Sequence, residues 1–158
     1  MWGWKKKKTA NWETEAPGRA WKTTPWHDAW ATRVDPSRLN VAEQALLDAV
    51  EKRLSAAERE TIEEQKALLS AVRRHREPGA AVSRFEGLGV HSGATPFRQG
   101  YPENLLGAAR LVWDGGMAEA RIELVGGRLN AIHFAAAGVD GQPFPPTDFD
   151  IESVQIFR

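Results

Sequence analysis

Hydrophobic and charged residues alternate in the second half of the chain, and this alternation predicts antiparallel β-strands. In residues 109–134 (ARLVWDGGMAEARIELVGGRLNAIHF), three runs of β character are separated by Gly115-Gly116 and by Gly126-Gly127. A two-residue glycine connection between two such runs is typical of a tight hairpin. The middle run supplies apolar side chains to one face of the predicted sheet, namely Ala118, Ala120, Ile122 and Leu124. The charged side chains between them are expected to face water together with a histidine of the next run: Glu119, Arg121, Glu123 and His133.

A helical spacing of apolar residues precedes the strands, over about residues 36–76. Asp35 before Pro36 is typical of a helix start. The segment NVAEQALLDAVEKRL then carries one apolar stripe, made of Val41, Ala45, Leu46, Ala49, Val50 and Leu54. Ser55 and Glu58 form the pattern of a capping box, which predicts that a second helix begins there. In SAAERETIEEQKALLSAVRRHRE the glutamates come early and the arginines late, as the helix dipole favours, so we expect one helix that ends at Pro78-Gly79.

Two further strands complete the predicted sheet, which spans about residues 81–158. The segments AAVSRFEG and FDIESVQIFR both have β character, and loops rich in Gly, Ser and Pro separate them from the hairpins. The order of helices followed by strands predicts the α+β class, with two helices packed on one face of an antiparallel β-meander. We expect residues 35–158 to form this single domain.

Residues 1–34 show neither a helical nor a strand period, and we expect them to form a flexible or extended arm. Six of the seven tryptophans lie here without a common face. Trp21, Trp26 and Trp30 stand closest to the first helix, and we expect them to pack against the body of the protein or against a partner. Four consecutive lysines form an electrostatic tail: Lys5, Lys6, Lys7 and Lys8. This tail either adds solubility or makes weak contacts with a membrane surface or with nucleic acid.

The composition narrows the classes of function. The chain is 42% hydrophobic and 27% charged, which is the balance of a globular domain. It has no cysteine, which excludes disulfides, thiolate metal sites and cysteine nucleophiles and suits a cytoplasmic location. No apolar run approaches the roughly 20 residues of a membrane-spanning helix, and the first residues do not have the pattern of a signal peptide.

One group of carboxylates is the main candidate for catalytic chemistry. Asp148, Asp150 and Glu152 alternate along the last strand, where they would share one face and could hold a divalent metal ion in a hydrolase. The alternative, which we favour, is an edge strand that uses charge to avoid aggregation, because no His, Lys or Ser motif accompanies the carboxylates. GLGVHSG is followed by Ala94-Thr95-Pro96 rather than by a helix, so we expect a loop and no bound nucleotide. The four histidines are scattered, and we therefore expect no metal site, no cofactor and no catalytic residue.

Two segments together resemble a group of small uncharacterised bacterial proteins. They are LSAAERETIEEQ and, after a gap, GAARLVWDGGMAEARIELVGGRLNAIHF. In that group a helix rich in leucine and glutamate precedes two strands that end in a glycine, a short apolar stretch and an aromatic residue. The likeness covers about half of the chain. Many small domains of this kind are accessory or immunity proteins, so the resemblance implies a bacterial protein without catalytic machinery, and it assigns no site residue.

These features predict a non-catalytic protein-binding module, and most concretely an immunity-type inhibitor that occludes a partner protein such as a basic toxin or enzyme. The outward-facing residues of the meander and the tryptophans of the arm are the predicted contacts. We expect the exposed sheet face to be acidic, because residues 78–158 carry six Lys and Arg against nine Asp and Glu. Two alternatives remain: a metal-dependent hydrolase that uses the terminal carboxylates, and a peripheral adaptor held at a membrane or nucleic acid by the lysine tail.

Overall fold

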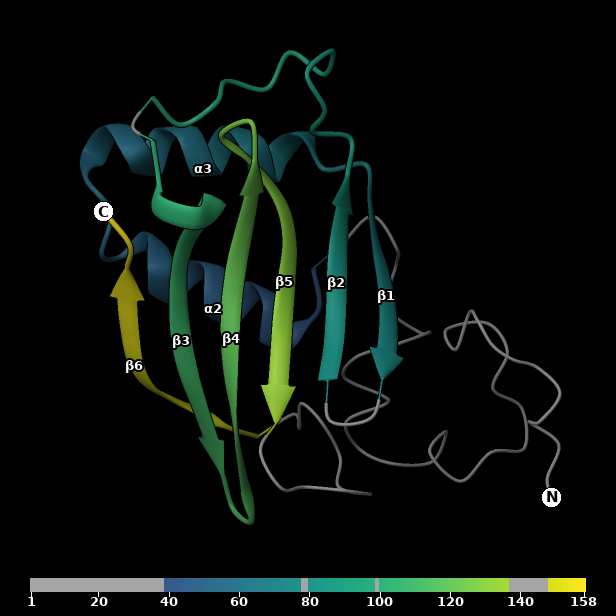
Figure 1. The fold of residues 1–158 in the computed structure, drawn as a ribbon, viewed down its shortest axis with the longest axis vertical. Helices are drawn as coiled ribbons and strands as arrows, with labels where there is room; N and C mark the ends of the chain where they lie inside the picture. The colour runs from purple at the N-terminus through teal and green to yellow at the C-terminus, as the bar shows by residue number, and fades with distance from the viewer. Residues whose placement is uncertain (1–38, 78–79, 99, 137–147) are drawn as a thin grey trace, which may run out of the picture.

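The computed structural model describes residues 39–77, 80–98, 100–136 and 148–158, and in them two α-helices cover one face of a six-stranded antiparallel sheet (Figure 1). The helices are α2 (Val41–Glu51) and α3 (Ala56–Leu68). The strands are β1 (Ala71–Glu77), β2 (Ala80–Glu86), β3 (Leu105–Trp113), β4 (Gly116–Val125), β5 (Arg128–Ala136) and β6 (Asp150–Ile156), with a short 3-10 helix, η3 (Pro102–Asn104), before β3. The α+β class and the packing of both helices on one sheet face are confirmed. None of the described helices has the length and apolar character needed to cross a membrane.

The strands lie in the order β1-β2-β5-β4-β3-β6, and every pair is antiparallel. The last strand in the sequence, β6, therefore pairs with β3 and forms one edge of the sheet, as its alternating charges predicted. The other edge is β1 (Figure 1). Between these edges β3, β4 and β5 form the meander that the glycine spacing predicted, with Gly126 and Gly127 both at positive φ in its second turn. The first turn is Asp114-Gly115, since Gly116 already opposes Trp113 in the ladder.

Each helix begins at a capping box, but only one of the two was recognised in the sequence. Ser55 accepts a hydrogen bond from the Glu58 backbone N–H, and the Glu58 carboxylate accepts one from Ser55, which confirms the predicted start of α3. The prediction that α2 begins at Pro36 is wrong, because its N-cap is Asn40, whose backbone is extended. Val41 at the first turn is 58% exposed and does not belong to the buried stripe. The buried residues of α2 are Ala42, Glu43, Leu46, Leu47 and Val50.

The prediction of helix up to residue 76 is also wrong, because α3 ends at Leu68 and residues 71–77 form strand β1. The sheet therefore starts at Ala71 and not near residue 81. Val72 and Arg74 are buried whereas Arg73 between them is exposed, which is the period of a strand. Arginines at the end of a segment favour a helix C-terminus, but pairing with β2 over seven consecutive residues outweighs this local preference.

The core lies between the helices and the sheet, and a loop contributes to it. The predicted inner residues of β4 are buried, with Ala120 and Ile122 at 0% exposure. The segment between β2 and β3 also buries four side chains, namely Leu88, Ala94, Phe97 and Tyr101. GLGVHSG opens this segment and contains no helix, as expected.

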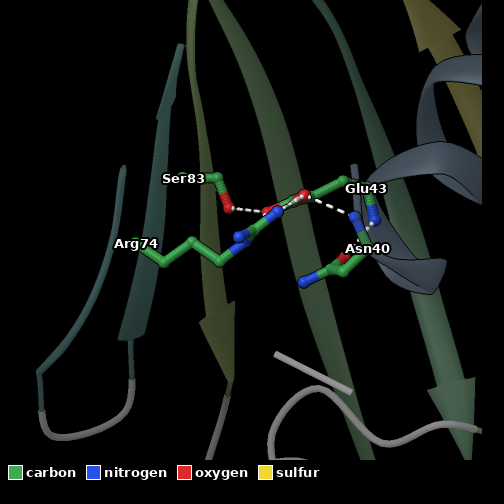
Figure 2. A network of polar contacts seen from close by, with 4 residues as sticks. All are labelled: Asn40, Glu43, Arg74 and Ser83. Carbon is green, nitrogen blue, oxygen red and sulfur yellow. Dashed lines mark hydrogen bonds and ion pairs between the residues drawn. The ribbon is translucent and has the colours of Figure 1, made fainter. Parts of the chain in front are cut away.

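A buried polar network holds the first turn of α2 against β1 and β2 (Figure 2). The Glu43 carboxylate accepts hydrogen bonds from Arg74 Nη2 at 2.7 Å and from Arg74 Nε at 2.8 Å. It also accepts from the Ser83 hydroxyl and, at 2.8 Å, from the Asn40 backbone N–H. Glu43 and Ser83 are completely buried and Arg74 is 1% exposed. Because a buried charge must be paired, the network specifies which turn of the helix meets which strands.

Candidate interaction surface

The sheet face turned away from α2 and α3, here called the outer face, is not covered by any described helix (Figure 1). Glu119, Arg121 and Glu123 of β4 lie on it, because the residues that alternate with them are buried. His133 of β5 lies directly opposite Arg121 in the strand register, so it shares this face. The predicted orientation of all four side chains is thus confirmed.

Most charged side chains of the outer face have a polar partner on the same face. Arg121 Nε lies 2.8 Å from Glu119 Oε1, and both side chains are at least half exposed. Glu123 Oε2 lies 3.5 Å from His133 Nε2, while Glu123 Oε1 accepts a hydrogen bond from the Asn130 amide. Nearer the two edges, two arginines pair with glutamates of neighbouring strands, Arg73 with Glu86 at 2.8 Å and Arg110 with Glu152 at 3.4 Å. Such pairing restricts the rotamers of long side chains before any partner arrives.

The expectation of an acidic face is wrong, because the outer face carries charges of both signs. Strands β1, β2, β3 and β4 each place an arginine on this face. Part of the acidic excess of residues 78–158 lies outside the outer face. The net charge of residues 78–158 could not reveal this, because β1 and its cations precede that segment.

Two charges of the outer face have no ion pair among the side chains that the structure describes, and they lie near opposite edges of the sheet. Arg84 of β2 is exposed, and its neighbour across the strand pair is another cation, Arg73. Asp150 of β6 is also exposed, and it stands opposite the apolar Val112. Arg84 near the β1 edge and Asp150 near the β6 edge are therefore charges of opposite sign without an ion pair among the side chains that the structure describes.

The terminal carboxylates do not form a common site. Asp150 and Glu152 belong to β6, but Asp148 precedes the strand. The register between β3 and β6 shifts at Arg110/Leu111, so Glu152 occupies an irregular position and pairs with Arg110. In the ranges that the structure describes, no group of three or more His, Asp or Glu side chains is arranged to hold a metal ion.

A groove beside α3 is a feature that the sequence did not suggest. It has a volume of about 520 Å³ and lies between the exposed side of α3 and the loop at Thr95–Arg98, with Arg158 at one end. Gln65, which is completely buried, fixes the loop wall by donating to the Thr95 carbonyl at 2.7 Å and accepting from the Leu129 N–H at 2.8 Å. The signal in the sequence was a glutamine on the apolar side of a helix, where a polar group needs partners.

The groove wall is further ordered by Glu58, whose carboxylate accepts a hydrogen bond from the Tyr101 hydroxyl and pairs with Arg158 at 3.1 Å. Burial alone would raise the pKa of Glu58, but the hydrogen bonds from Tyr101 and Ser55 outweigh burial and hold the pKa below its usual 4.5. Burial and the adjacent carboxylate raise the pKa of Tyr101 well above its usual value. Glu58 is therefore an anion and Tyr101 a neutral donor at neutral pH, a combination that stabilises the wall.

The remaining predicted contacts, Trp21, Trp26, Trp30 and the lysines at 5–8, lie outside the described residues. Of the predicted set, the structure brings together Glu119, Arg121, Glu123 and His133 and surrounds them with further charges. The outer face is thus the candidate surface on which the functional argument rests. Comparisons with protein-family models, with curated proteins and with solved structures find no match.

Proposed function

We propose that this protein is a non-catalytic binding module that recognises a partner protein through the outer face of its sheet. The observation that supports the proposal is the row of polar contacts on β4 and β5, where Arg121 pairs with Glu119 and His133 lies beside Glu123. Side chains already held in place lose less conformational entropy on binding than free ones. Paired, alternating charges also reject partners with the wrong pattern, because like charges would then meet in the interface.

The partner should present charges of both signs. An anionic group is favoured opposite the Arg84 side of the outer face and a cationic group opposite the Asp150 side. This differs from a uniformly basic partner, since Glu119 already pairs with Arg121 and Glu123 already accepts a hydrogen bond from the Asn130 amide. The most concrete form of the proposal is an inhibitor of immunity type, active in the cytoplasm of a bacterium, that occludes a toxin or an enzyme.

Affinity capture tests the proposal when three baits are compared. The baits are the unchanged chain, the outer-face variant Glu119→Lys/Glu123→Lys, and a control variant Glu60→Lys/Glu63→Lys with the same change of charge at exposed positions of α3, on the other side of the sheet. We expect the unchanged chain and the control to retain the same protein and the outer-face variant to lose it. Equal capture by all three baits would place the binding surface elsewhere and overturn the proposal.

A further inference from the structure

We draw no further inference here: the strongest candidate, the groove of about 520 Å³ between α3 and the loop at Thr95–Arg98, is lined by exposed charges of both signs, and nothing among the residues that the structure describes shows what would occupy it.

Discussion

Arg74 and Glu43 meet inside the protein through two hydrogen bonds of 2.7 and 2.8 Å, with both side chains fully removed from solvent. One residue comes from an edge strand and the other from the first turn of a helix. A buried ion pair contributes little net stability compared with a well-packed apolar pair. The loss of one partner is costly, however, because it leaves the other charge buried and unpaired. The pair therefore acts mainly on the specificity of the fold, by fixing α2 against β1.

The first prediction concerns this pair. Arg74→Met should lower the free energy of unfolding by about 3–5 kcal/mol, because Glu43 then remains buried without its cation. The double variant Glu43→Leu/Arg74→Met should be more stable than Arg74→Met alone, since no charge is left behind. Urea denaturation of both variants measures the difference. A double variant less stable than the single one would show that Glu43 stabilises the fold even without Arg74, through its hydrogen bonds with Asn40 and Ser83.

The second prediction concerns the turn between β4 and β5. A Cβ atom on Gly127, whose φ is +76°, would lie 2.8 Å from Pro96 Cβ, whereas one on Gly93, whose φ is +83°, would have nothing within 4 Å. Both alanine variants incur backbone strain, but only Gly127→Ala adds a steric clash with the groove loop. We expect Gly127→Ala to cost at least about 1 kcal/mol more than Gly93→Ala in chemical denaturation. An equal loss of stability in the two variants would mean that the loop containing Pro96 moves aside without cost.

The third prediction concerns acid stability. Because the pKa of Glu58 is lowered in the folded protein, its carboxylate contributes stability that is present above pH 4.5 and is lost as the pH falls through the folded pKa. Glu58→Gln should lower the melting temperature at neutral pH and reduce the further loss on acidification. Glu60→Gln on the same helix, where no hydrogen bond of the carboxylate is seen among the described residues, is the control. Parallel melting curves for both variants between about pH 7 and pH 3 would contradict the role of Glu58.

Much of the fold could be predicted because its signals are local. The alternation from Ala118 to Leu124 specifies a strand within a few residues. Gly126 and Gly127 specify a turn in the same local way. The same alternation placed Glu119, Arg121 and Glu123 correctly on the outer face. The capping box at Ser55 is local too, and it was correct.

The missed features depend on contacts between residues far apart in the chain. Arg74 can be buried because it donates hydrogen bonds to Glu43, which lies 31 positions earlier in the chain. The local sequence AVRRHRE does not indicate that partner. Gln65 reaches Thr95 and Leu129 in the same way, which produces the groove wall. Because the arginine-rich segment of β1 has the local pattern of a helix C-terminus, the sequence does not place Arg73 next to Arg84, and it does not indicate the mixed charge of the outer face.

The central claim is that the outer face carries the binding surface, and the association rate with the purified captured partner tests it most directly. Stopped-flow measurements at two ionic strengths would compare the unchanged chain with Glu119→Lys/Glu123→Lys and with the control Glu60→Lys/Glu63→Lys. We expect the outer-face variant to associate at least about tenfold more slowly at low salt, with a smaller difference at high salt, and the control to match the unchanged chain. Identical rates for all three proteins would contradict the claim.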